Sequence, residues 1–145
     1  MEDVLHYSVS IKWDEGRIGT LSAEGLKDIQ GATPPEFAKG VPGYWSPEHL
    51  FVAAVTSCLM TTFLAIAENS GLEFSDYKAD ANSTLEKVDG KFQVTEIEIK
   101  PVIKIKNEKD KEKALRILDK SERGCLISNS IKTKVHLNPE ILVVE

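Results

Sequence analysis

The chain has 145 residues, of which 41% are hydrophobic and 28% are charged, and its formal net charge is −5 at pH 7. These values predict a single soluble domain spanning residues 1–145, large enough to bury a substantial core. The negative charge argues against binding to nucleic acid or to an anionic membrane, which requires clustered Lys and Arg. Without an apolar N-terminal segment no signal peptide is expected, and two cysteines without a disulfide framework indicate a cytoplasmic protein that uses thiols for chemistry.

The N-terminal region predicts a β-hairpin. Apolar and polar residues alternate over residues 5–13, which is typical of a half-buried strand. Residues 14–16 form a turn signal, and residues 18–23 can return as the second strand, with Arg17 at its start. Residues 31–45 then read as an irregular loop.

Large apolar side chains gather on this loop and just beyond it. Their composition allows two interpretations: they pack under the core, or they line a hydrophobic substrate pocket. The candidate pocket residues are Phe37, Tyr44, Trp45 and Phe51.

A long, mostly buried helix is predicted between Ser46 and Gly71. The Ser46 hydroxyl can accept from an unpaired amide of the first turn, and Pro47 suits the first helical position. Gly71 can end the helix as a C-cap. Apolar residues cover most of its circumference, which predicts a helix enclosed on nearly every side. The apolar run is too short and too interrupted to predict a membrane span.

Two strands joined by a hairpin follow this helix. Residues 77–87 and 92–106 predict the strands, and Asp89-Gly90 is a strong signal for a two-residue turn. The alternation of apolar residues changes phase near residues 95–96, which predicts a bulge. Pro101 cannot donate to a ladder, which predicts a free strand edge there.

The C-terminal region predicts a second helix over residues 107–122, a short helix over 125–130, and strands over 132–137 and 141–144. This order of strands and helices is typical of an α+β domain.

The only two cysteines are Cys58, inside the long helix, and Cys125, after the second helix. Both could be inert, because free cysteine is often buried. The segments around them, SPEHLFVAAVTSCL and GCLISNSIKTKVHL, nevertheless resemble two motifs of the OsmC/Ohr family of thiol peroxidases. These motifs are (S/N)PE-x-L…SC and GC-P-(I/V)-S-(N/K). The resemblance covers about residues 8–140, and Leu126 stands where many members have Pro.

This resemblance implies an OsmC-like fold, with antiparallel strands around a long buried central helix, in an intertwined homodimer with shared active sites. It implies a thiol-dependent, peroxiredoxin-like peroxidase that reduces organic hydroperoxides in oxidative-stress defence. Cys58 would be the reactive cysteine and Cys125 the resolving cysteine, with Arg17 and Glu48 in the same catalytic site. A dithiol, a lipoyl group in some members, would reduce the resulting disulfide. No metal, haem, flavin or other cofactor is implied.

The chemistry of Cys58 leads to the same trio of residues. Burial inside an apolar helix raises a thiol's pKa, so a thiolate there needs a nearby cation or hydrogen-bond donor. Arg17 is the best candidate, and Glu48 could hold its guanidinium in a bidentate pair. Arg17 could instead be a solvated turn residue.

Helix geometry separates Glu48 from Cys58. Ten residues of α-helix rise about 15 Å and leave the two side chains about 80° apart. If both serve one site, either Glu48 comes from a partner subunit or the helix bends.

Three classes of function therefore remain open: a hydroperoxide reductase, a noncatalytic protein that binds an apolar ligand, and a thiol redox sensor. A metal site is not expected, because three scattered histidines and two distant cysteines lack the spacing of metal ligands.

Overall fold

The computed structural model describes residues 3–144. The chain divides into two compact units, of which the first ends at Phe51 and the second begins at Val52. The single domain expected from the sequence stays a prediction.

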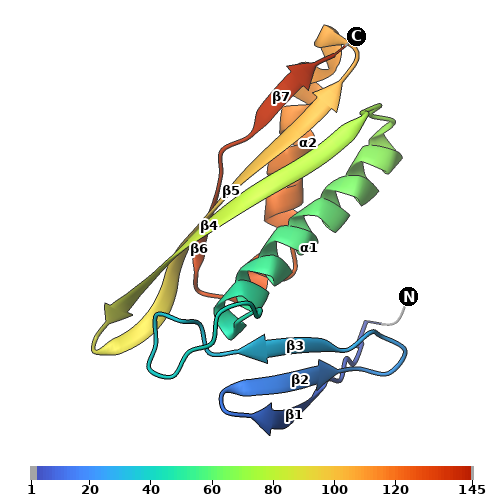
Figure 1. Ribbon diagram of the computed structural model, residues 1–145. Helices are drawn as coiled ribbons and strands as arrows, with labels where there is room; N and C mark the ends of the chain where they lie inside the picture. Colours follow the sequence, from blue (N-terminus) through green and yellow to red (C-terminus); the bar gives the residue numbers. More distant parts are fainter. Residues whose placement is uncertain (1–2, 145) are drawn as a thin grey trace. The chain divides into compact units, whose positions relative to one another are not determined.

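The elements follow the α+β order predicted from the sequence, and Figure 1 labels them along the chain. One strand was not predicted: β3 ends inside the segment that was expected to be an irregular loop. The strands are β1 (Ser10–Glu15), β2 (Ile18–Ser22), β3 (Ile29–Ala32), β4 (Asp76–Val88), β5 (Lys91–Ile105), β6 (Lys134–Leu137) and β7 (Glu140–Val143). The helices are α1 (Pro47–Ser70) and α2 (Lys111–Gly124), with short 3-10 turns η1 (Glu108–Asp110) and η2 (Ser128–Ser130).

The first unit contains a three-stranded antiparallel sheet in the order β1-β2-β3. The predicted hairpin is confirmed, and Gly16 takes the positive φ of 51° that its turn requires. The prediction of a half-buried strand over residues 5–13 is wrong for the single chain. The strand begins only at Ser10, and Ile11 and Trp13 remain 70% and 72% exposed because nothing in the described chain covers them.

The entry into α1 is held by the cap that the sequence predicted. The Ser46 hydroxyl accepts from the His49 amide at 3.1 Å. His49 reciprocates, because its Nδ1 lies 3.3 Å from the Ser46 amide nitrogen and 2.7 Å from Oγ. His49 thus takes the place of the Glu in a capping box. At the other end Gly71, with φ 70°, closes the helix, and the Leu72 amide donates to the Ala67 carbonyl oxygen at 3.0 Å.

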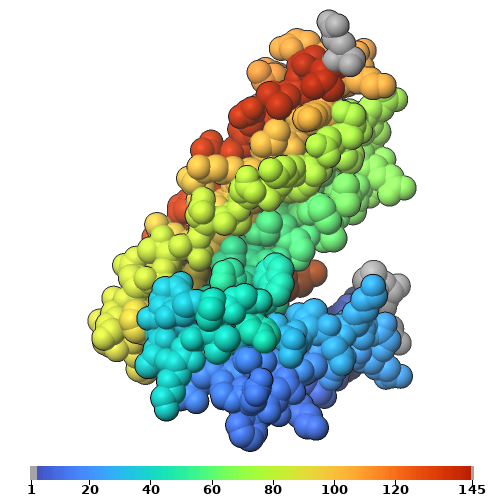
Figure 2. All heavy atoms as spheres, in the orientation of Figure 1, coloured from blue at the N-terminus to red at the C-terminus, as the bar shows by residue number. Residues whose placement is uncertain are grey.

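Helix α1 packs through one stripe and not on nearly every side, so that prediction is wrong for the single chain. The stripe has helical spacing and consists of Val55, Cys58, Leu59, Phe63 and Ala67. Outside this stripe Met60 and Leu64 are 37% and 38% exposed. Figure 2 shows atoms of this helix, in green, at the surface beside β4. The helix is long and apolar enough to cross a membrane by length and composition alone, but core helices of soluble proteins share these features.

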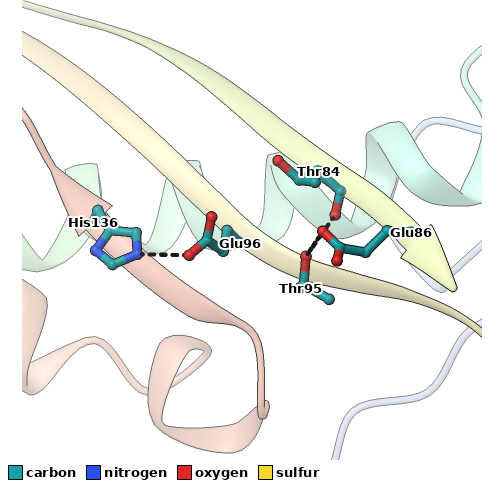
Figure 3. Close-up of polar contacts among 5 residues, drawn as sticks. All are labelled: Thr84, Glu86, Thr95, Glu96 and His136. Atoms are coloured by element: carbon teal, nitrogen blue, oxygen red, sulfur yellow. Dashed lines mark hydrogen bonds and ion pairs between the residues drawn. The ribbon is translucent and has the colours of Figure 1, made fainter. Parts of the chain in front are cut away.

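The β4–β5 hairpin confirms two local predictions. Asp89 and Gly90 both have positive φ, 52° and 80°, as a type I′ turn requires. Thr84 pairs with Glu96 and Leu85 with Val94, which leaves Thr95 as the extra residue of a bulge. The Thr95 hydroxyl donates to Glu86 Oε2 at 2.9 Å, with the Thr84 carbonyl oxygen 3.5 Å away (Figure 3).

The sheet of the second unit is mixed, so the predicted antiparallel arrangement of the strands holds only in part. β4 runs antiparallel to β5, but β6 and β7 both run parallel to β5 along its other edge. The chain crosses over through α2 before β6, and such a crossover brings the next strand back in parallel. His136 of β6 accordingly lies beside Glu96 of β5, 3.5 Å from Nε2 to Oε1 (Figure 3).

Pro101 lies in an interior strand and not at the predicted free edge. It pairs with Ala79 of β4. On its other side the ladder breaks between Leu137 of β6 and Glu140 of β7. The missing N–H of Pro101 therefore falls where the neighbouring strand is already interrupted.

The core of the second unit lies between the two helices and one face of the sheet. Alternate residues of β5 are buried, and the residues between them are mostly exposed, so only one face is covered. The core cluster contains Phe63, Ala67, Leu72, Ile103, Ile105, Ala114, Ile117, Leu118 and Ile141. These contacts fix the position of α1, which contains Cys58, against α2, which Cys125 follows directly.

Candidate functional site

The structure brings the two cysteines together within the second unit. Cys58 lies on the buried stripe of α1, and Cys125 is the residue that ends α2. Both are free thiols, 9% and 0% exposed, and the Cys125 thiol hydrogen-bonds to the Cys58 sulfur. Two cysteines far apart in the sequence are thus close enough to react with each other.

The chain after α2 turns sharply and points backbone amides at Cys58. Cys125 is extended, with φ −69° and ψ 110°, and the Asn129 amide then donates to the Cys125 carbonyl oxygen at 3.0 Å. The first amides of such a turn have no acceptor within it. Those of Leu126 and Ile127 donate to the Cys58 sulfur instead.

These donors set the acidity of Cys58. Burial raises the pKa of its thiol, but four donors together hold that pKa below its usual value. In decreasing order they are the Cys125 thiol, the Ile127 amide, the Thr62 hydroxyl and the Leu126 amide. The Thr62 oxygen lies 4.0 Å from the sulfur, one helical turn along α1. Of the two cysteines Cys58 therefore forms a thiolate, the reactive form of cysteine, more readily.

Cys125 has the opposite tendency. Burial raises the pKa of its thiol, and the neighbouring Cys58 raises it further. The hydroxyl and amide of Ser128 oppose this rise only in part. When one thiol of the pair ionises, it is therefore Cys58, and the thiol of Cys125 keeps its proton and donates toward the Cys58 sulfur.

The first unit contains Arg17 and an apolar cavity of about 510 Å³. Arg17 follows the β1–β2 turn and lines this cavity together with Ile11, Trp13, Leu21 and Leu50. A mostly apolar cavity with one cation in its wall can accept a hydrophobic molecule that carries a polar group.

Glu48 lies in the first turn of α1. Its Oε1 is buried and has no hydrogen-bond partner among residues 3–144. No ion pair joins Glu48 to Arg17 within the described part of the first unit. The pairing of these two side chains stays a prediction, and the unsatisfied oxygen indicates that Glu48 has room for a donor from elsewhere.

None of the four predicted substrate-binding residues is among those that line the Arg17 cavity. Phe37, Tyr44 and Phe51 are half-buried. Trp45 is 55% exposed, and its ring meets the His49 ring edge-on at 6.2 Å between centroids.

Sequence reasoning missed three side chains near the cysteine pair. Thr62 stands four residues after Cys58, a spacing that places both on one helix face. Glu122 precedes Cys125 by three residues and Ser128 follows it by three. These spacings could have been found from the sequence, but only the turn after α2 explains why they matter. Residues 3–144 contain no group of three or more side chains that could hold a metal ion.

Comparisons with known proteins agree with this fold. A family model described as OsmC-like protein matches residues 40–140. The uncharacterised protein YmaD of Bacillus subtilis is 25% identical over 143 residues, covering 95% of this chain and 94% of its own. An OsmC-like protein of unknown function from Vibrio cholerae has a similar structure, with a TM-score of 0.86 and 24% identity, over 94% of this chain and 99% of its own. An organic hydroperoxide resistance protein OsmC from Legionella pneumophila superposes with a TM-score of 0.76 and 21% identity, over 98% of this chain and all of its own. Because the family model matches well over half of the chain, the protein belongs to the OsmC-like protein family.

Proposed function

We propose that this protein is a cysteine-based reductase of organic hydroperoxides, with Cys58 as the nucleophile and Cys125 as the resolving cysteine. One observation carries the proposal: the fold brings two free, buried thiols from distant parts of the chain together. The lowered pKa of Cys58 and the raised pKa of Cys125 support the two roles. The Legionella relative, described as an organic hydroperoxide resistance protein, supports the same chemistry.

In the first step the Cys58 thiolate attacks the terminal oxygen of the hydroperoxide. An S–O bond forms and the O–O bond breaks, so that Cys58 becomes a sulfenic acid. The leaving alkoxide takes a proton from solvent and departs as an alcohol. The sulfur loses two electrons to the peroxide in this step.

In the second step Cys125 attacks the sulfenic acid. A disulfide forms between Cys58 and Cys125, and the hydroxyl of the sulfenic acid leaves as water with the proton of Cys125. An external dithiol, such as a lipoyl group, then reduces the disulfide by thiol–disulfide exchange.

Arg17 and Glu48 enter this proposal as residues that act on Cys58 in a homodimer. Three features support a second copy of the chain: the uncovered side of α1, the exposed apolar side chains of β1, and the unsatisfied Glu48 oxygen. A guanidinium can donate to a thiolate and a peroxide oxygen together, and a carboxylate can hold it in place. We place this reaction in the cytoplasm, where thiols remain reduced.

The direct test is consumption of tert-butyl hydroperoxide with dihydrolipoamide as the reductant. The wild type should turn over many equivalents, whereas Cys58→Ser should consume none above background. Ser57→Ala is the matched control, because it removes an exposed hydroxyl from the neighbouring position and should leave turnover unchanged. Equal rates in the wild type and Cys58→Ser would refute the proposed function.

The apolar cavity favours a second candidate, a noncatalytic protein that binds a hydrophobic ligand. Such a protein would keep both thiols after treatment with a stoichiometric hydroperoxide. A redox sensor would lose them but would not turn over with a dithiol.

A further inference from the structure

Helix α2 carries a row of basic side chains that the steps above do not use. At intervals of three, four and three residues the row contains Lys113, Arg116, Lys120 and Arg123, a spacing that places all four on one face of the helix. It holds two of the three arginines of a chain whose net charge is −5. Like charges at this spacing repel one another, so the stability of the helix does not account for the row.

The row lines a groove of about 710 Å³ along α1 and α2, which we call the basic groove. Ile66 of α1 and Ile117 of α2 contribute apolar surface to it. Arg123 is paired with Asp119 at 3.2 Å, but the other three cations of the row form no ion pair with any of residues 3–144. The basic groove thus combines apolar surface with three cations that are not neutralised, and this combination suits an acidic ligand.

One end of the basic groove lies close to the cysteine pair. Gly124 directly follows the last cation of the row, and a Cβ atom at its position would lie 3.9 Å from Thr62 Cγ2 of α1. Thr62 is one helical turn from Cys58, and Cys125 directly follows Gly124. A ligand that binds along the groove therefore reaches to within about one helical turn of the two cysteines.

The length of the row indicates what kind of ligand fits. The ten residues of α-helix from Lys113 to Arg123 rise about 15 Å, so a single carboxylate or phosphate reaches only part of the row. An extended acidic segment reaches all of it. Nucleic acid fits less well, because the chain as a whole is negatively charged and no aromatic side chain lines the groove for stacking. The basic groove therefore fits an acidic segment of another protein.

We propose that the basic groove docks an acidic segment of the protein whose dithiol reduces the Cys58–Cys125 disulfide. This inference rests on the proposed function, in which an external dithiol completes each cycle. One thiolate of the docked partner attacks the disulfide, so that the Cys58–Cys125 bond breaks and a mixed disulfide forms. The partner's second thiolate then breaks the mixed disulfide, and the partner leaves with a disulfide of its own. Two electrons pass from the partner to the cysteine pair, and the partner's two thiol protons end on Cys58 and Cys125.

The experiment compares two synthetic peptides that carry the same dithiol. In the first a dihydrolipoyl-lysine is flanked by glutamates, and in the second glutamines replace them. Steady-state rates at saturating tert-butyl hydroperoxide give kcat and KM for each peptide and for uncharged dihydrolipoamide. Fluorescence anisotropy of the rhodamine-labelled, oxidised peptides measures binding independently of turnover.

Two variants of the full chain separate the groove from the net charge. The groove variant combines Lys113→Gln, Arg116→Gln and Lys120→Gln. The control variant removes the same charge from exposed lysines outside the groove and combines Lys78→Gln, Lys91→Gln and Lys106→Gln. Circular dichroism establishes that both variants are folded.

At low salt the wild type should bind the glutamate peptide about tenfold more tightly than the glutamine peptide, because several exposed ion pairs each contribute a small factor. The KM for the glutamate peptide should be lower by a similar factor. Salt at about 0.5 M should remove most of this preference, because it screens exposed charges. The groove variant should lose the preference at low salt but keep the wild-type kcat and the wild-type kinetics with dihydrolipoamide. The control variant should keep the preference.

A wild type without a preference, or a groove variant that retains it, would overturn the docking site. An equal loss of preference in the groove and control variants would also overturn it, because the net charge would then cause the attraction. Tighter binding of a single-stranded oligonucleotide than of the glutamate peptide would assign the groove to nucleic acid. Dissociation of a dimer in the groove variant alone would assign it to a second copy of the chain, and either result would contradict the proposal. A wild type that turns over with none of the three dithiols would refute the proposed function instead, and the anisotropy measurement would still decide whether the groove binds acidic segments.

Discussion

The Leu126 amide allows a sharp test of how the turn after α2 activates Cys58. Leu126→Pro removes one N–H donor to the Cys58 sulfur and little else, because the Leu126 side chain is 67% exposed. The backbone tolerates the change, since Cys125 already has the extended conformation that a following proline favours.

The expected rise in the pKa of Cys58 depends on how strong the Leu126 amide is compared with the other donors to the sulfur. The Leu126 amide is the weakest of the four that lower the pKa of Cys58, so the pKa should rise only modestly without it. An ordinary hydrogen bond contributes about 0.5–1.5 kcal/mol, which corresponds to about a twofold to tenfold loss of thiolate below the pKa. The rate of Cys58 alkylation should fall by the same factor.

The assay is the pH dependence of iodoacetamide alkylation, quantified on the Cys58 peptide by mass spectrometry. Leu126→Ala is the matched control, because it shortens the side chain but keeps the amide, and should leave the curve unchanged. Superimposable curves for Leu126→Pro and Leu126→Ala would mean that the turn amide does not stabilise the thiolate. The same result would weaken the assignment of the Ile127 amide.

Three further predictions test the proposed function, and a fourth concerns the stability of the second unit. Arg17→Ala should slow alkylation of Cys58 at least about tenfold, because it removes a charge-assisted donor, and Arg17→Lys should restore little of the rate. An unchanged rate in Arg17→Ala would mean that Arg17 is a solvated residue without a role at Cys58. Cys125→Ser should still consume one equivalent of peroxide per chain but not turn over with a dithiol, and full turnover would reject its resolving role. The wild type should sediment as a dimer at micromolar concentration and Met60→Glu should weaken it, whereas a wild-type monomer would contradict a shared site. Burial raises the pKa of Tyr77 from 10.0 to about 12, so its contribution to stability is complete below pH 10 and lost as the pH rises through about 12. In urea titrations at several alkaline pH values, the free energy of unfolding should fall less with pH in Tyr77→Phe than in the wild type. An equal fall in both proteins would mean that other groups cause the loss of stability.

Local signals in the sequence were sufficient for much of the fold. The Ser46 cap, the Gly71 C-cap, the Asp89-Gly90 turn and the bulge at Thr95 each depend on residues close in the sequence. A short stretch of sequence is enough to recognise each cause. The causes are an unpaired backbone amide, a residue that must take a positive φ, and a change in the alternation of apolar and polar residues.

Long-range pairing was harder to predict. The parallel arrangement of β6 and β7 depends on where α2 returns the chain, and nothing in either strand's own residues specifies it. The apolar circumference of α1 was identified correctly, but only one stripe is buried because a single chain lacks enough surface to cover the rest.

The residues of the candidate site could likewise be predicted only in part. Cys58 and Cys125 could be selected from the sequence because their flanking motifs are distinctive. The amides of Leu126 and Ile127 could not, because any residue except proline carries an N–H and only the turn directs it at the sulfur. Glu122 and Ser128 were likewise indistinguishable from surface residues until burial left their oxygens without partners.

The central claim is that Cys58 and Cys125 form one redox pair. Its most direct test is the intact mass and free-thiol content of the reduced wild type after one equivalent of tert-butyl hydroperoxide. The account predicts loss of both thiols, a decrease in mass of two hydrogen atoms, a Cys58–Cys125 peptide after digestion, and recovery of both thiols with dihydrolipoamide. Retention of both thiols, or oxidation of Cys58 beyond the sulfenic acid without a disulfide, would contradict it.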